Sequence, residues 1–253
     1  MSSVTASRRV GNGPGHLLGR FPASPRLLPT RQIWPPLTIL LLIVIISWAS
    51  LRTNAAWHFL AARSITDTML ETGEFTQGAI DDAKDRIRLA LRHFPNQPDY
   101  LDLAGHLQEF QANQVGVIGK QRRELLESAA GHYRKALSVR PLWPYSWVNL
   151  LSVKDKLGQV DPEFNKAMQR AVETGPWEPR VQLEVITSGV RHWDRLDVVE
   201  KNLVRKKVKD AMKIQPREVF AIMKTFGRPD LVCAEAGDFV RINQWCEDVF
   251  AQE

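Results

Sequence analysis

The side chains that could perform acid–base, metal or nucleophilic chemistry are scattered along this 253-residue chain. No His-Glu-x-x-His segment occurs, and no carboxylate or cysteine accompanies a histidine at metal-ligand spacing. No serine lies in a nucleophile elbow. We therefore expect no catalytic residue, no metal ion and no cofactor, and interpret five isolated histidines as surface or capping residues: His58, His93, His106, His132 and His192.

The pair Gly119-Lys120 is the closest approach to a phosphate-binding loop. That motif needs a glycine five residues before the second glycine, where this chain has Gln114, and a serine or threonine after the lysine, where it has Gln121. The pattern excludes a phosphate loop. We predict instead that 112–120 is a surface loop, either a contact element or an insertion without a role.

The two cysteines, Cys233 and Cys246, both lie near the C-terminus. A disulfide between them would stabilise the segment that they enclose by about 3 kcal/mol. Two buried free thiols are equally compatible with the sequence. The pairing stays open at this stage.

A pattern of four residue types at fixed intervals occurs four times in the sequence, and it predicts the helices that position these residues. Each set has a small or apolar residue, an apolar or aromatic residue at +4, alanine at +7 and proline at +12, and the sets begin 46, 35 and 40 residues apart. The sets are Ala83, Ile87, Ala90, Pro95; Ala129, Tyr133, Ala136, Pro141; Phe164, Met168, Ala171, Pro176; and Val204, Val208, Ala211, Pro216. This pattern is typical of the second helix of a tetratricopeptide repeat, which ends at a proline.

We therefore predict an all-α fold, a tetratricopeptide-like solenoid of helical hairpins preceded by one transmembrane helix. Four degenerate repeats occupy 53–216 and capping helices occupy 217–253. The expected helices after the transmembrane helix are 79–93, 98–111, 123–139, 145–157, 162–174, 179–192, 196–214, 216–226 and 238–251. Four unrelated hairpins with helix-ending prolines are the alternative.

The stretch from Gln32 to Leu51 is uncharged and rich in leucine and isoleucine, and it is long enough to cross a bilayer. We therefore predict a transmembrane anchor over 33–52. No glycine or proline follows Leu37 until Gly73, which predicts one uninterrupted helix. The preceding residues 1–32 mix glycine, proline, serine and arginine, and we expect a disordered basic tail. A cleaved signal peptide is the rival interpretation, but 52–56 is a poor cleavage site.

The distribution of charge predicts the orientation of this anchor. Five arginines and no acidic residue precede it, which favours a cytoplasmic N-terminus: Arg8, Arg9, Arg20, Arg26 and Arg31. With Arg52, the first 52 residues carry the whole formal charge of +6, so the remainder is neutral. The sequence pI of about 9.5 therefore reflects topology, and we do not expect nucleic-acid binding.

In a stack of helical hairpins the first helices line a concave groove, which is the expected contact surface for a partner. The residues that we expect to line it are Tyr145, Val148, Ser152 and Asp155 in the third repeat, with Gly105 and Gln108 in the second. Trp143 and Trp177 are candidate rim aromatics that could stack on sugar rings or partner side chains, or pack in the core. The cations at 201–209 form either a solvated helix face or a surface for an acidic partner.

The layout resembles a known family. A basic tail, one anchor and degenerate repeats carrying RPLWPYSW at 140–147 and ETGPWEPRVQ at 173–182 are similar to the VpsP-type polysaccharide biosynthesis proteins of Gram-negative bacteria. The resemblance implies a single-pass protein of the bacterial inner membrane with its repeats in the periplasm. It also implies a place beside exopolysaccharide machinery, and it transfers no catalytic residue.

We therefore expect a non-enzymatic, membrane-anchored repeat scaffold that supports exopolysaccharide biosynthesis, polymerisation or export. Its expected partners are other inner-membrane or periplasmic proteins. A repeat adaptor in cytochrome c maturation or envelope protein assembly would share this layout. An enzyme acting on a glycan or a lipid carrier would need paired acids or a metal, for which the sequence offers no pattern.

Overall fold

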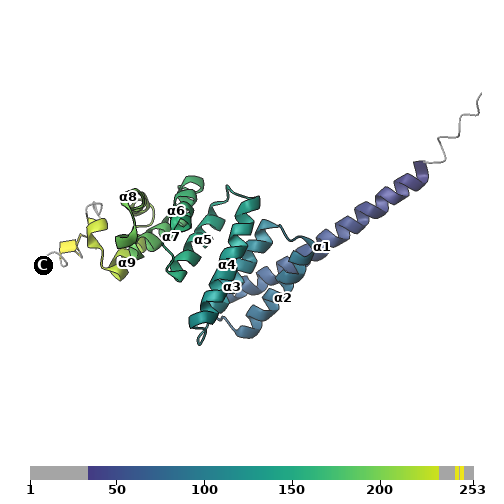
Figure 1. The fold of residues 1–253 in the computed structure, drawn as a ribbon, viewed down its shortest axis with the longest axis horizontal. Coiled ribbons are helices and arrows are strands. Elements are labelled where there is room, and N and C mark those ends of the chain that lie inside the picture. Colours follow the sequence, from purple (N-terminus) through teal and green to yellow (C-terminus); the bar gives the residue numbers. More distant parts are fainter. Residues whose placement is uncertain (1–33, 234–242, 245, 248–253) are drawn as a thin grey trace, which may run out of the picture. The chain divides into compact units, whose positions relative to one another are not determined.

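Helices make up every regular element in the part of the chain that the computed structural model describes, residues 34–233, 243–244 and 246–247. The predicted tail 1–32 and most of the predicted helix 238–251 lie outside these residues. The helices are α1 (Trp34–Thr72), α2 (Gln77–His93), α3 (Pro98–Ala112), α4 (Gly119–Val139), α5 (Pro144–Leu157), α6 (Pro162–Thr174), α7 (Pro179–Arg191), α8 (Val198–Met212) and α9 (Pro216–Phe226), with short 3-10 turns at Trp193–Arg195 and Pro229–Leu231. The predicted all-helical class is confirmed for these residues (Figure 1).

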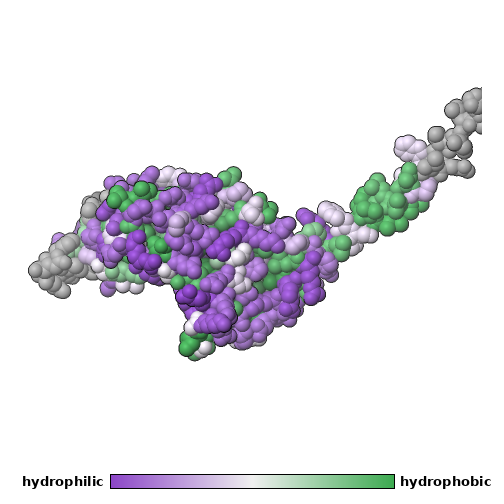
Figure 2. All heavy atoms as spheres, in the orientation of Figure 1, coloured by the Kyte–Doolittle hydropathy of each residue, from purple (hydrophilic) through white to green (hydrophobic). Residues whose placement is uncertain are grey.

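Helix α1 runs without interruption from Trp34 to Thr72 and ends where Gly73 takes a positive φ of 71°. The prediction of one helix that lasts until this glycine is confirmed, since glycine adopts this backbone conformation without steric cost. The helix is long and apolar enough to cross a membrane. Its apolar side chains from Leu37 to Ile46 are about half exposed and form a continuous hydrophobic surface (Figure 2).

The chain divides into two compact units, Met1–Ser47 and Trp48–Glu253. Within the second unit each helix from α2 to α9 packs against the next one along the chain. Helix α5 also contacts α7, α7 contacts α9, and α6 contacts α8. Alternate helices therefore lie side by side, which arranges the hairpins in two layers (Figure 1).

The four hairpin junctions share one backbone geometry. The residue before each repeat proline has φ between −139° and −130° and ψ between 58° and 74°, at Phe94, Arg140, Gly175 and Gln215. Each of their N–H groups donates to the carbonyl of the repeat alanine four residues earlier, at N···O distances of 2.8–3.1 Å. A proline disfavours the helical conformation of the residue before it, which accounts for the shared geometry. Helices α2, α4 and α6 end directly at this residue, whereas α8 ends at Met212, three residues before Gln215.

The apolar core follows the repeat pattern of the sequence. All twelve residues at the first three positions of the four sets are at most 3% exposed. Small side chains at these positions let the neighbouring helix approach. Trp147 also packs in the core, with its indole N–H donating to the carbonyl of Pro141 at 2.8 Å. The spacing read from the sequence thus identifies the buried face of α2, α4, α6 and α8.

One loop is shorter than expected, and one cysteine pairing that was open is resolved. Helix α4 begins at Gly119, four residues before its predicted start, so the surface loop comprises only the residues between Ala112 and Gly119. Val115 and Ile118 in this loop are strongly exposed. Near the C-terminus, Cys233 and Cys246 form a disulfide, which resolves the pairing that the sequence left open.

Candidate functional site

A groove of about 640 Å³ opens along the first helices of the hairpins, within the unit Trp48–Glu253. Helices α1, α3, α5 and α7 each contribute side chains to it. The lining residues are Phe59, Arg63, Thr66, Asp67, Leu70, Asp99, Asp102, Leu103, His106, Phe110, Trp143, Tyr145, Asn149 and Arg180. Aromatic rings, carboxylates, an amide and guanidinium groups therefore meet on one surface.

A polar stripe runs along α3 at the floor of this groove, and three of its members line the groove: Asp99, Asp102 and His106. Asp99, Asp102, His106 and Glu109 follow one another at intervals of three and four residues, which places them along one face of the helix. Beside this stripe α3 approaches α4 so closely that a Cβ atom on Gly105 would lie 2.5 Å from the ring of Tyr133. Only glycine leaves room for that ring. This close approach brings the Tyr133 hydroxyl within hydrogen-bonding distance of the polar stripe.

Hydrogen bonds join side chains of four helices, α3, α4, α5 and α7, into one connected chain. The Tyr133 hydroxyl donates to Oε1 of Glu109, whose Oε2 accepts from Lys156. Because that hydroxyl proton is already used, the 3.3 Å contact between Tyr133 Oη and His106 Nδ1 requires a proton on Nδ1. Nε2 of His106 is then the acceptor for the Asn149 amide at 3.2 Å.

The protonation states agree with this direction. Burial lowers the pKa of His106 to about 4, so the imidazole is neutral at physiological pH and one of its nitrogens accepts. Burial, followed by the charge of Glu109 and the hydrogen bond to it, raises the pKa of the Tyr133 hydroxyl well above its usual range. The phenol therefore stays protonated and remains a donor.

The last member of this series of hydrogen-bonded side chains is Arg180, at the start of α7. Its guanidinium donates to Oδ1 of Asn149 at 2.9 Å and lies 5.8 Å from the ring centroid of Tyr145. Arg180 is exposed, and no carboxylate among the described residues pairs with it. A guanidinium has five N–H donors, so most of those on Arg180 remain available to a ligand in the groove.

The other end of the groove carries the opposite charge. Arg140 lies between Asp99 and Asp102, at 3.0 and 3.2 Å, and the Ser146 hydroxyl donates to Asp102 at 2.7 Å. Burial raises the pKa of the Asp102 carboxyl, against the lowering effect of Ser146 and Arg140. Two carboxylates share one guanidinium here, so the groove is acidic near α3 and basic at Arg180.

The predicted groove residues have different positions in the structure. Tyr145 lines the groove and donates to Glu178 at 2.6 Å. Val148 is 1% exposed and lies beneath the surface, and Gly105 is buried against Tyr133, so neither offers a side chain to the groove. Gln108 faces away from it, in a hollow beside α2 and α4, where it accepts from Lys84 at 3.3 Å.

The last two of these residues belong to a polar layer further along α5. Ser152 donates to Glu184 of α7, whose carboxyl has a pKa raised by burial. Asp155 is buried and pairs with Arg191 and, at 2.8 Å, with Nε2 of His192. Both side chains connect α5 to its neighbours instead of lining the groove.

Of the two candidate rim aromatics, one lines the groove and the other does not. Trp143 lines the groove, 40% exposed, with the Arg140 guanidinium 4.4 Å from its ring centroid. Trp177 is 69% exposed, does not line the groove, and has the ammonium of Lys207 5.8 Å from its ring. Only Trp143 joins Tyr145 as an aromatic wall.

The basic segment 201–209 is not a uniform solvated face. Lys207 is buried, with its ammonium 2.9 Å from Asp210 and 3.2 Å from the carbonyl of Pro176. Lys201 and Arg205 lie 5.8 and 5.1 Å from the ring centroid of Trp193. Part of this charge therefore holds α8 against the rest of the fold.

Sequence reasoning missed His106, Asn149 and Arg180. The interpretation of His106 as a surface or capping residue was wrong, because its ring lies on the groove floor between Tyr133 and Asn149. The regular spacing of the polar residues on α3 was the available signal. Within the part of the chain that is described, no group of three or more His, Cys, Asp or Glu side chains is placed to hold a metal ion.

Comparison with known proteins adds no assignment to this geometry. No protein-family model matches the chain, and no curated protein matches it in sequence.

Proposed function

We propose that this protein is a non-enzymatic scaffold of tetratricopeptide-like repeats, anchored in the bacterial inner membrane, that binds a partner protein in the groove of its first helices. The four junctions with one backbone geometry and the buried repeat positions support the repeat assignment. The exposed apolar stretch of α1 supports the anchor.

The arginines before α1 support the proposed orientation. With no acidic residue among them, they favour retention of the N-terminus in the cytoplasm and place the unit Trp48–Glu253 in the periplasm. The disulfide between Cys233 and Cys246 supports the same side, because disulfides persist in oxidising compartments. The similarity of 140–147 and 173–182 to the VpsP-type proteins favours exopolysaccharide machinery as the partner.

The observation that carries the proposal is the preorganised guanidinium of Arg180. A chain of hydrogen bonds from Lys156 to Asn149 holds it in position, while its remaining donors face an open groove. A ligand that meets Arg180 does not have to order this side chain, so little entropy is lost on binding. The hydrogen-bonding protons of Tyr133 and His106 are each used within the protein, which favours recognition over proton transfer.

Site-specific photo-crosslinking of the full-length protein in membranes tests this proposal. A photoreactive amino acid at Tyr145 should capture a component of the exopolysaccharide machinery, and Arg180→Ala should reduce the yield about tenfold. The same probe at Glu127, an exposed position on α4, is the matched control. Equal capture from both positions, or recovery of haem-handling proteins without polysaccharide machinery, would contradict the proposal.

A further inference from the structure

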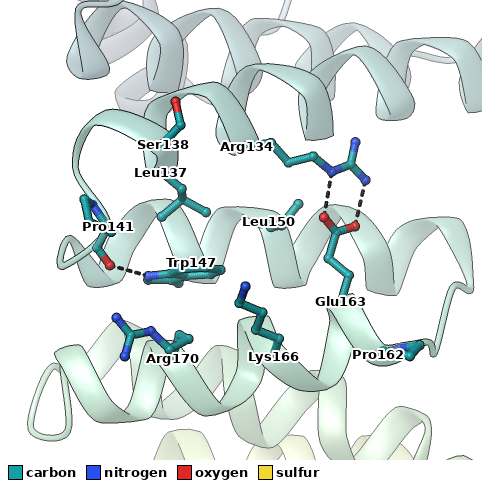
Figure 3. A pocket seen from close by; sticks show the side chains of 10 residues that line it. All are labelled: Arg134, Leu137, Ser138, Pro141, Trp147, Leu150, Pro162, Glu163, Lys166 and Arg170. Carbon is teal, nitrogen blue, oxygen red and sulfur yellow. Dashed lines mark hydrogen bonds and ion pairs between the residues drawn. The ribbon is translucent and has the colours of Figure 1, made fainter.

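A second hollow lies on the opposite set of helices, between α4 and α6 and above α5 (Figure 3). Its volume is about 800 Å³, and it shares no lining residue with the groove. The lining residues are Arg134, Leu137, Ser138, Pro141, Trp147, Leu150, Pro162, Glu163, Lys166 and Arg170. Three of these side chains are cationic and one is acidic.

The single acid is fully engaged. Glu163 accepts from Nε and a terminal nitrogen of Arg134, both at 2.7 Å (Figure 3). It also accepts from the buried ammonium of Lys154 at 3.0 Å. The Arg134 and Lys154 contacts lower the pKa of this carboxyl to about 2, despite its partial burial. Glu163 therefore cannot also neutralise the other cations of the hollow.

Lys166 provides unmatched charge, and Arg170 lies one helical turn further along α6. Lys166 is exposed, extends into the hollow and has no hydrogen-bond or ion-pair partner within the described part of the chain (Figure 3). Arg170 bonds to Glu173 on its own helix at 2.9 Å, outside the hollow, and its guanidinium lies 5.9 Å from the ring of Trp147. Two cations thus stand along one side of an open cavity.

The corresponding position one hairpin earlier shows that this charge is not imposed by the fold. The hollow between α2 and α4 contains Lys84 and Arg88 but also Asp81 and Asp85. Its Lys84 donates to the side-chain carbonyls of Gln108 and Gln111. Two acids accompany two cations among the residues lining that hollow, whereas one acid, Glu163, accompanies three cations among those lining the hollow beside α6.

The next position along the stack is bridged by protein contacts. Helix α6 contacts α8 directly, and Gln169 donates to Glu200 across them at 2.8 Å. Of these three equivalent positions, the one between α4 and α6 is both open and cationic.

We propose that the hollow between α4 and α6 binds an extended acidic segment of a partner protein, with two carboxylates engaging Lys166 and Arg170. These cations are one helical turn apart, about 6 Å along the axis. Alternate residues of an extended chain are about 6.6 Å apart and point the same way, so acids at positions i and i+2 meet both cations. Leu137 and Pro141 on the facing helix end contact the rest of the segment.

Fluorescence anisotropy tests the proposal with the full-length protein in lipid nanodiscs. The probe is a fluorescein-labelled peptide Gly-Glu-Leu-Glu-Gly, with Gly-Gln-Leu-Gln-Gly as its neutral counterpart. We expect binding of the acidic peptide that weakens at least tenfold in the double variant Lys166→Glu/Arg170→Glu and falls as salt is raised. Arg88→Glu, in the hollow between α2 and α4, should leave the affinity unchanged.

Each other outcome overturns the inference. Equal affinity for the neutral peptide, or equal affinity of the double variant, would show that these cations do not recognise acids. Competition by free glutarate at the peptide's own concentration would assign the hollow to small dicarboxylates. The milder variant Lys166→Gln, with a thermal melt unchanged from the parent protein, separates lost recognition from lost folding.

Discussion

The groove on the first helices and the hollow between α4 and α6 hold polar groups in opposite ways. In the groove, His106, Asn149 and Tyr133 bond to one another, and only the last member of the chain is left open. In the hollow, Lys166 has no such support. The same hairpins therefore build two kinds of surface. The polar side chains of the groove, between first helices, are held in place by one another, whereas Lys166 in the hollow, between second helices, is free to change conformation.

The physical reason lies in the depth of the two sites. Side chains on the groove floor lose water, so each must find a partner within the protein or destabilise the fold. Exposed cations keep their hydration and need no partner, so they contribute little to stability and can change freely. Substitutions in the groove should therefore affect stability strongly, and substitutions in the hollow weakly.

The largest effect is expected at Gly105. In Gly105→Ala the new methyl group would lie 2.5 Å from the buried ring of Tyr133, which cannot move without breaking its bond to Glu109. We expect a loss of about 2–3 kcal/mol in the free energy of unfolding, measured by urea denaturation. Gly131→Ala on α4, where a Cβ atom meets nothing within 4 Å, is the control and should be neutral or slightly stabilising.

The second effect is a pH dependence that arises from His106. Its folded pKa of about 4 lies below the unfolded value near 6.5, so the unfolded chain binds a proton more readily. The contribution of His106 to stability is complete above pH 6.5 and is lost as the pH falls to about 4, on the order of 3 kcal/mol in total.

Urea denaturation at pH 7 and pH 4.5 measures this contribution. Asp102 and Glu184 have raised pKa values and act in the opposite direction, but they are present in both proteins compared. The difference between the parent protein and His106→Gln isolates the histidine. An equal loss of stability on acidification in the two proteins would place the imidazole outside the hydrogen-bonded chain.

A smaller effect is expected at the edge of the hollow. Arg134 makes a two-pronged ion pair with Glu163, but its side chain is 46% exposed. Arg134→Ala should lower the free energy of unfolding by less than about 1 kcal/mol, because solvent screens the pair. Thermal unfolding in low and high salt measures this loss. A loss of stability comparable to that of Gly105→Ala would contradict the view that substitutions in the hollow affect stability less than those in the groove.

The smallest effect is expected at Lys166. Because this side chain is exposed and bonds to no other described residue, Lys166→Ala should change the free energy of unfolding by less than about 0.5 kcal/mol. The same substitution should lower the affinity of the protein for the acidic peptide. A variant that loses stability without losing peptide affinity would show that Lys166 supports the fold.

Much of the fold could be predicted because it depends on local patterns. Prolines at fixed positions end the second helices, and the alternation of small and apolar residues marks their buried faces, so the sequence alone locates α2, α4, α6 and α8 closely. Composition alone identifies the apolar part of α1. The assignment of the hairpins to the tetratricopeptide type stays a prediction.

The candidate site was harder to predict because its members are distant in sequence. His106 and Asn149 are separated by 43 residues, and Asn149 and Arg180 by 31. A rotation of one residue on a helix, about 100°, separates the buried Val148 from Asn149 on the groove. Helical periodicity identified a stripe on α5 but not which side of that stripe faces α3 and α7.

The sequence by itself determined the helical elements, their prolines, the apolar stretch of α1 and the neutral charge balance of the residues beyond it, because each depends on neighbours along the chain. Only the tertiary structure decided that Gly105 admits the Tyr133 ring, that His106 is neutral, and that Arg180 and Lys166 lie in separate open sites. Burial, pKa and hydrogen-bond partners depend on what the packed hairpins exclude from water, and that exclusion exists only once the helices are stacked.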